Sequence, residues 1–244
     1  MSKGAKRWSW KRWLAIGVVA VAGALVAGPF VYIHFIQGEA PPPLALSSTA
    51  TPAATASDTG VGTGAADSAA VTSDGVWTVS DGSVVGYRVK EVLFGQSNEA
   101  VGRTNALTGS ISVSGTTVTG GSFTVDMTTV SSDESRRDGQ FNGRIMETSL
   151  YPTATFTITK AIDIGSVPAD GVQQTFAATG ELTLHGVTKT VDVEVTGQIS
   201  GRTVQVAGSI PITFSDWNIG NPSFGPVTTE DHGVLEFALN FTRG

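Results

Sequence analysis

The residues that most often carry enzyme chemistry are scarce in this 244-residue sequence. It contains no cysteine, which excludes disulfide scaffolds, thiolate metal sites and cysteine nucleophiles. Its only histidines are His34, His185 and His232, so a histidine metal centre or a catalytic triad would need most of them. These counts point away from the commonest catalytic and metal-binding arrangements.

Two of the histidines lie in the part of the chain that we expect to fold. His185 stands in LTLHGVTK, near the predicted end of a strand, where we expect it to hydrogen bond within a turn. His232 follows Glu230 and Asp231, which could bind a cation weakly, although a solvated turn is the simpler interpretation. A hydrolase would need a nucleophile beside one of these histidines, with the imidazole as general base.

No catalytic or nucleotide-binding motif accompanies these residues. The patterns GxSxG and HExxH and the Walker loop do not occur in residues 74–244. Gly60, Gly62 and Gly64 lack the preceding strand and following helix that a dinucleotide-binding loop requires. We therefore predict a protein that is not an enzyme and that uses no cofactor and no metal ion.

Charge is distributed unevenly along the chain. Residues 1–36 carry a net charge of +5, residues 37–73 carry −3 and residues 74–244 carry −8, which together give −6. An acidic body is a poor match for phosphate backbones, so we predict no nucleic-acid partner.

Residues 13–36 form an apolar run of 24 residues without a charged side chain. At about 1.5 Å per residue, such a helix can span the roughly 30 Å hydrocarbon core of a bilayer. Basic side chains occur in residues 1–12 and acidic ones do not, which by the positive-inside rule keeps this stretch in the cytoplasm and exports the rest. We predict a single-pass signal-anchor helix in the cell membrane. The alternative is a cleaved signal that leaves a secreted or periplasmic protein, because Ala20-Val21-Ala22 resembles a cleavage site.

Residues 37–73 have the composition of a disordered linker. Ala, Pro, Ser, Thr and Gly make up 29 of these 37 residues, and no aromatic residue occurs among them. Such a segment cannot bury enough apolar surface to offset its ordering entropy. As a flexible coil it would reach about 35 Å.

From residue 74 onward, apolar and polar residues alternate as they do in half-buried strands. Phe123, Val125 and Met127, for example, alternate with Thr124 and Asp126. Eight or nine antiparallel strands fit over residues 74–244. Both a sandwich and a closed barrel satisfy this pattern. Because several strands are long and apolar along one whole face, we predict an all-β, eight-stranded antiparallel, lipocalin-like barrel.

Residues 131–152 break the alternation. Ser131 and Glu134 have the spacing of a capping box, and Phe141 and Ile145 would share one helix face. Pro152 marks the return to extended chain. We predict one or two short helices that close one end of the barrel.

An apolar ligand would explain the lack of polar motifs, since each buried CH₂ contributes about 0.8 kcal/mol by itself. The alternative is that side chains fill the interior. The candidates for lining the lumen and binding lipid are the apolar residues of the predicted inward faces. They are Phe123, Val125, Met127, Phe156, Ile158, Phe176, Leu182, Leu184, Phe214, Trp217 and Phe237.

Four stretches of the body together resemble the YceI family of lipocalin-like, polyisoprenoid-binding exported proteins. They are SVVGYRVKEVLFGQSNEAVGRTNALTGSISV, RRDGQFNGRIMETSLYPTATFTIT, TGELTLHGVTKTVDVEVTG and ITFSDWNIG. The resemblance implies an eight-stranded antiparallel barrel with helical elements that holds a long isoprenoid, quinone or fatty-acyl chain. The sequence departs from the family pattern at Glu91, Thr104 and residues 145–147, so the resemblance does not identify the ligand.

We therefore expect a membrane-tethered exported protein that holds a long apolar ligand in its lumen. Its partners would be that lipid and the cell membrane, the latter through the N-terminal helix. The alternative is a structural or protein-interaction module of the cell envelope, with a solid barrel and an exposed apolar patch.

Overall fold

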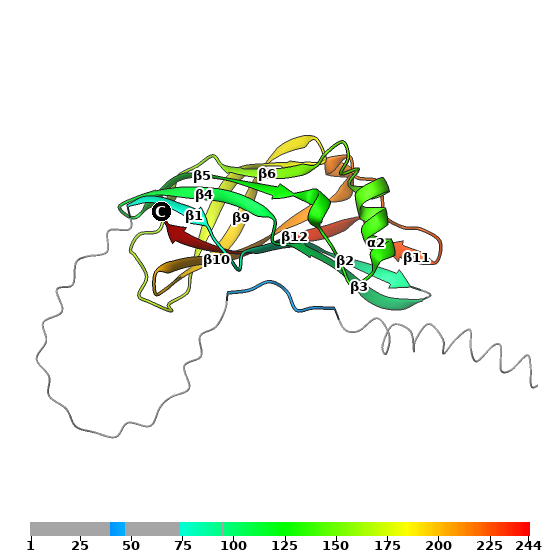
Figure 1. Cartoon of the computed structure of the whole chain (residues 1–244), viewed down its shortest axis with the longest axis horizontal. Helices are drawn as coiled ribbons and strands as arrows, with labels where there is room; N and C mark the ends of the chain where they lie inside the picture. The colour runs from blue at the N-terminus through cyan, green and yellow to red at the C-terminus, as the bar shows by residue number, and fades with distance from the viewer. Residues whose placement is uncertain (1–39, 47–73, 94) are drawn as a thin grey trace, which may run out of the picture.

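The computed structural model describes residues 40–46, 74–93 and 95–244. Residues 74–244 form an antiparallel β-barrel with one α-helix, α2, at one end (Figure 1). The strands are β1 (Gly75–Val79), β2 (Val84–Leu93), β3 (Gln96–Thr104), β4 (Leu107–Ser114), β5 (Thr117–Asp126), β6 (Thr153–Ile158), β7 (Ile162–Asp163), β8 (Gln174–Leu184), β9 (Val187–Ser200), β10 (Thr203–Thr213), β11 (Val227–Thr229) and β12 (His232–Arg243). The helical elements are η2 (Met127–Thr129), α2 (Ser135–Gln140), η3 (Phe141–Ile145) and η4 (Phe214–Trp217).

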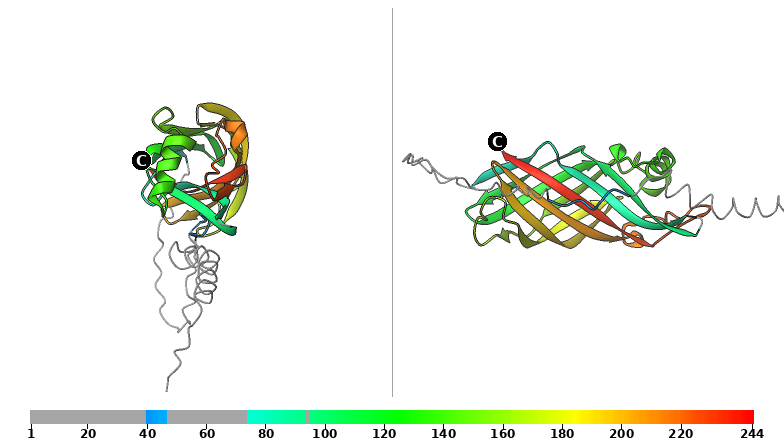
Figure 2. Two further views of the ribbon diagram at one scale, coloured as in Figure 1. Left: turned by 90° about the vertical axis from the view of Figure 1, so that its right-hand side faces the viewer. Right: turned by 90° about the horizontal axis from the view of Figure 1, so that it is seen from below.

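Eight strand positions close the barrel. The order β1-β4-β5-β6-β8-β9-β10-β12 returns to β1, because β12 pairs with β1 as well as with β10. β2 occupies the same place around the barrel as β1, because β12 pairs with both strands. β3 occupies the same place as β4, because β3 pairs with β2 and β4 pairs with β1. Viewed along its long axis, the barrel is a ring of strands (Figure 2, left). The predicted eight-stranded antiparallel barrel is confirmed.

The short β11 and the tip of β2 mark one end of the barrel. Val227–Thr229 pairs with Leu93–Glu91, and α2 lies at the same end (Figure 1). We call this the α2 end. The opposite end, which we call the β1 end, contains Gly75 and the turn between β4 and β5.

The helical segment that covers the α2 end differs from the prediction in its first turn. Glu134, not Ser131, is the N-cap residue, and its side chain accepts a hydrogen bond from the Arg136 amide. Ser131 instead exchanges two backbone hydrogen bonds with Arg103 of β3, at 2.8 and 3.1 Å. The capping-box spacing was misleading because a strand-like pairing takes the backbone of Ser131.

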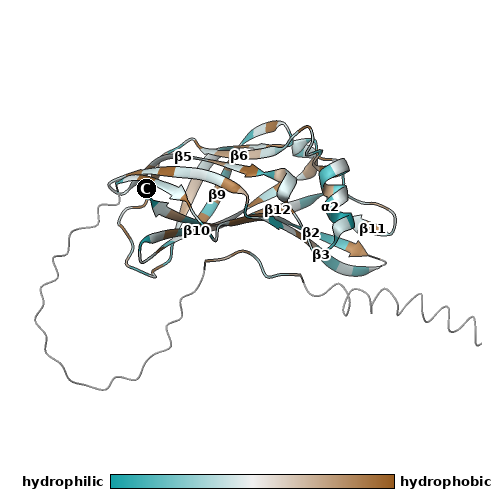
Figure 3. Ribbon diagram, in the orientation of Figure 1, coloured by the Kyte–Doolittle hydropathy of each residue, from teal (hydrophilic) through white to brown (hydrophobic). Residues whose placement is uncertain are grey.

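Alternation of side chains along the strands produces the interior. Apolar residues recur along the strands between polar ones (Figure 3). One buried cluster lies toward the α2 end and includes Phe141, Leu184 and Phe214. A second lies toward the β1 end and includes Trp77 and Phe241. Phe237 packs against both clusters, so the two form a continuous apolar interior.

The chain before the barrel is described only at residues 40–46. This extended segment lies against the outside of the barrel (Figures 1 and 2) and hydrogen bonds to Arg88, Arg103 and Glu236. For these seven residues the structure differs from the disorder predicted over residues 37–73. Among the described residues, no helix is long and apolar enough to cross a membrane. The predicted membrane span, residues 13–36, lies outside them.

Candidate functional site

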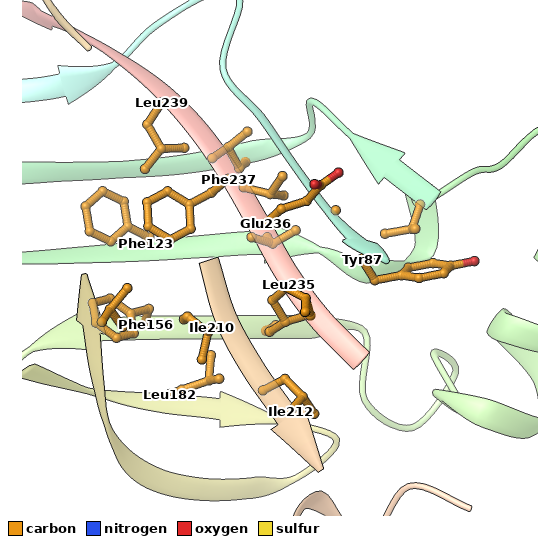
Figure 4. A pocket seen from close by; sticks show the side chains of 18 of the residues that line it. Tyr87, Phe123, Phe156, Leu182, Ile210, Ile212, Leu235, Glu236, Phe237 and Leu239 are labelled. Atoms are coloured by element: carbon orange, nitrogen blue, oxygen red, sulfur yellow. The ribbon is translucent and has the colours of Figure 1, made fainter. Parts of the chain in front are cut away.

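The barrel encloses a cavity of about 1860 Å³ that runs along its length. Protein interiors are normally packed with few voids larger than a water molecule, and small-molecule pockets measure roughly 300–1,000 Å³. Most of the wall is aliphatic and aromatic, and strands on all sides of the barrel contribute to it. Phe123, Phe156, Leu182, Ile210 and Phe237 come from different strands and face the same space (Figure 4). The barrel is therefore hollow.

The structure places ten of the eleven predicted lumen residues along this cavity, and their contact with a ligand remains a prediction. The exception is Trp217, which does not line the cavity and is only 3% exposed. It ends the turn η4, and its carbonyl lies 3.2 Å from Nδ1 of His185. The strand ends at Thr213, so alternation no longer determines which way Trp217 points.

The wall becomes polar near the α2 end. Tyr87 of β2 faces the cavity and stacks on Phe141 of η3, with ring centroids 5.1 Å apart. It lies over Gly102 of β3, where an added Cβ would come within 2.4 Å of the Tyr87 ring. The glycine therefore makes room for the ring.

The Tyr87 hydroxyl is a donor at the edge of this apolar wall. No other residue among those described accepts a hydrogen bond from it. Burial raises the pKa of this hydroxyl well above its ordinary value, so the group stays protonated. A protonated phenol that faces a cavity can donate to a ligand oxygen.

An ion pair lies beside Tyr87. Glu91, also on the inward face of β2, accepts a hydrogen bond from Asn98 at 2.7 Å and pairs with Arg137 of α2 at 3.3 Å. Arg137 also pairs with Asp133. Burial opposes the charge of Arg137, but the carboxylates of Glu91 and Asp133 raise its pKa above the ordinary value. The guanidinium is thus neutralised by the protein itself.

Sequence reasoning missed Tyr87, Glu91, Arg137 and Phe141 as parts of this site. Alternation in β2 places Val85, Tyr87, Val89, Glu91 and Leu93 on one face, and that signal could have identified Tyr87. Nothing in the local sequence shows that Arg137, 46 positions away, reaches Glu91.

His185 has the structural role predicted for it. The residue occupies a left-handed turn with φ of 48° between β8 and β9, and it is buried. Besides its contact with Trp217, its Nε2 lies 3.2 Å from Glu147 and its ring meets Tyr151 edge-on at 4.6 Å. These contacts tie the turn to the loop that follows η3.

His232 is exposed and lies 2.8 Å from Asp231 and 3.2 Å from Glu230. The hydrogen bond with His232 lowers the pKa of Asp231. Within residues 40–46, 74–93 and 95–244, no cluster of three or more potential ligands could hold a metal ion.

These features define a class of protein. A closed eight-stranded antiparallel barrel with a large apolar cavity is the architecture in which lipocalins hold small ligands.

The sequence identifies the family within this class. Residues 77–241 match the YceI-like domain, which covers nearly the whole barrel, and the chain belongs to this family. The resemblance found in the sequence is confirmed.

Two relatives match part of the chain. The chain is 33% identical to a UPF0312 protein of Vibrio parahaemolyticus over 120 residues, or 45% of this chain and 60% of that protein. It is 37% identical to a UPF0312 protein of Vibrio campbellii over 71 residues, or 29% of this chain and 34% of that protein. The chain thus spans less than two thirds of the length of these relatives.

A solved structure has the same fold. A polyisoprenoid-binding domain from Saccharophagus degradans superposes with a TM-score of 0.55 at 18% identity, over 69% of this chain and 98% of that domain.

Proposed function

We propose that this protein binds a long apolar lipid chain inside its barrel and presents that barrel on the exported side of a membrane. The ligand class is a polyisoprenoid, an isoprenoid quinone or a fatty-acyl chain.

The observation that carries this proposal is the cavity of about 1860 Å³ with its apolar wall. An apolar ligand needs no motif there, because burial of its chain supplies the binding energy, less the cost of ordering. The alternative of a structural module with a solid barrel does not agree with a lumen of this size.

The resemblance of the fold supports the choice of ligand. The Saccharophagus degradans domain is described as polyisoprenoid-binding. A long, continuous cavity without an internal partition suits a single extended chain better than a compact molecule.

The polar groups near the α2 end indicate where the head of such a lipid would lie. The Tyr87 hydroxyl can donate to an oxygen of the ligand, and Arg137 is already paired with Glu91 and Asp133. A neutral head with a carbonyl or hydroxyl oxygen therefore suits this site better than a carboxylate or phosphate.

The tether is the second part of the proposal. It rests on the apolar run of residues 13–36 and the basic residues before it. The protein would then be a single-pass membrane protein with a cytoplasmic N-terminus, and cleavage of the same segment would instead release it.

Blocking the lumen tests the binding function. Ala178 of β8 lines the cavity, whereas its neighbour Ala177 is exposed on the opposite face of the same strand. We expect Ala178→Trp to weaken binding of a fluorescent polyene alcohol at least tenfold and Ala177→Trp to leave it unchanged. Equal binding by both variants would contradict a luminal site.

A further inference from the structure

The outer face of the barrel carries a cluster of charged residues that the lipid-binding function does not use. Glu236 of β12, Gly86 of β2 and Arg103 of β3 lie side by side in register. The Glu236 side chain leaves β12 on the other side from Phe237 (Figure 4). It pairs with Arg103 at 2.9 Å and with Arg88 at 3.4 Å. Glu236 lies along the cavity wall, but its carboxylate makes these pairs on the outer side of the barrel and the residue is only 4% exposed.

Part of what covers Glu236 is the chain's own residues 40–46. Arg88 donates a hydrogen bond to the Pro41 carbonyl at 2.7 Å, and Arg103 donates to the Pro42 carbonyl. The Leu44 amide donates to Glu236 at 3.1 Å. We call residues 40–46 the strap.

The chemistry of the strap matches that of the cluster. Residues 41–43 are prolines, which have no N–H and offer only carbonyl oxygens, the groups that two guanidinium ions can bind. The first N–H after them belongs to Leu44 and meets the carboxylate. Proline also favours the extended conformation, so little chain entropy is lost when the strap docks.

Gly86 forms the floor of this site. An added Cβ there would lie 2.8 Å from Cγ of Arg103 and 2.3 Å from the Gly102 carbonyl. The missing side chain lets Arg103 lie across β2 to reach Glu236 and the strap.

The contacts also give the direction of the strap. Leu44 meets Glu236 at the level of Gly86, whereas Pro41 meets Arg88, two residues farther along β2 toward Leu93. Leu93 pairs with β11 at the α2 end. The start of the strap therefore points to the α2 end.

Three residues, 37–39, separate the strap from the apolar run of residues 13–36. A fully extended connection of this length reaches on the order of 15 Å, compared with about 35 Å for the whole linker as a free coil. We infer that the strap turns the α2 end of the barrel toward the membrane, so that this end docks on the lipid surface. This inference rests on the proposed membrane tether.

The α2 end exposes apolar side chains together with carboxylates such as Asp133 and Asp231. Phe224 is 65% exposed, Leu150 67% and Val92 41%. The Arg144 guanidinium lies 5.8 Å from the centre of the Phe224 ring, and Arg136 is exposed nearby on α2. Aromatic and basic side chains together are typical of proteins at the membrane–water interface. Phe224 also lines the cavity, so a lipid chain could pass there between bilayer and lumen.

Single-cysteine labels test this orientation, because the natural chain has no cysteine. Val92→Cys places a label at the α2 end, and Val76→Cys places one at the β1 end on a valine that is somewhat more exposed, at 54%. The full chain is reconstituted into phosphatidylcholine vesicles that contain a lipid-borne quencher. We expect the Val92 label to be quenched at least threefold more than the Val76 label.

A strap replacement provides the second arm. Residues 40–46 are replaced by a Gly/Ser sequence of equal length, with residues 50–56 replaced in the same way as the matched control. We expect the first replacement to abolish the difference between the labels and the second to preserve it. A difference that survives the loss of the strap would refute its role.

Recovery of the protein with floated vesicles separates the two possible failures. If the chain does not float with the vesicles, the tether is wrong and the inference falls with it. If it floats and the two labels are quenched equally, the tether stands and the orientation is refuted.

Discussion

The two faces of strands β2 and β12 differ in their chemistry. On the inner face, Tyr87, Leu235 and Phe237 line a cavity that the protein leaves unfilled. On the outer face, Arg88 and Glu236 pair with each other and are covered by the strap. The side chains of the two faces alternate residue by residue in the same backbone.

The difference follows from what each kind of group requires. A desolvated charge without a partner is costly, so the outer cluster is paired and hydrogen-bonded within the chain. An apolar wall can stand open inside a rigid barrel, and its atoms then gain contacts when a ligand enters. The outer face is complete in the protein alone, whereas the inner face leaves a cavity that a ligand could fill.

Addition of ligand should have the largest effect, because it completes the inner face. At a free concentration of one hundred times Kd, a ligand that binds only the folded barrel stabilises it by about 2.7 kcal/mol. We expect a polyisoprenoid alcohol to raise the unfolding free energy of the wild type by this amount in urea titrations. Ala178→Trp should show at most about half of this increase, because tenfold weaker binding leaves the ligand at about ten times Kd, and an equal increase in that variant would place the ligand outside the lumen.

Removal of Glu236 should disturb the outer cluster more than the inner face, because its carboxylate pairs with Arg103 and Arg88 although the residue lies along the cavity wall. Glu236→Ala leaves Arg103 and Arg88 without their shared carboxylate, although Arg88 keeps Glu99. We expect a loss of about 2 kcal/mol in unfolding free energy, below the 3–5 kcal/mol of a fully buried pair. The matched control is Glu181→Ala, an exposed site on β8. Lipid affinity should stay the same in both variants.

Tyr87→Phe tests the polar part of the inner face, because it removes the hydroxyl and keeps the ring. Loss of one hydrogen bond costs about 1 kcal/mol, or roughly fivefold in affinity. We expect that decrease for a polyisoprenoid alcohol and none for a hydrocarbon of similar length. An equal change for both ligands would show that the ring, and not the hydroxyl, matters.

Leu44→Pro should have the smallest effect, since the only strap hydrogen bond that it removes is the one from the Leu44 amide to Glu236. We expect hydrogen exchange of the remaining strap amides to quicken about threefold to tenfold, the value of one hydrogen bond. Ala45→Pro is the control, because it leaves the Leu44 amide in place. Equal exchange in the two variants would contradict the contact.

The sequence predicts the inner face better than the outer one. Period-two alternation is a local signal, and it identified the strands and such lumen residues as Phe123 and Phe176. Alternation was wrong for Trp217, which follows the end of β10. The capping-box pattern was wrong for Ser131. Both errors occur outside the named strands, where long-range contacts determine the local structure.

The strap could not be predicted from its own residues. Its composition is that of a disordered linker, and its partners lie at positions 88, 103 and 236. Nothing local indicates that two arginines and a glutamate from three strands meet on the outside of the barrel. The ion pair of Glu91 with Arg137 was missed for the same reason.

The most direct test of the account is to ask what the lumen holds. The full-length protein is purified in mild detergent alongside Ala178→Trp and Ala177→Trp, and each is analysed by native mass spectrometry and lipid extraction. We expect a long-chain lipid bound one to one to the wild type and to Ala177→Trp, and none in Ala178→Trp. Absence of lipid from all three proteins, with no uptake when long-chain lipids are added, would contradict it.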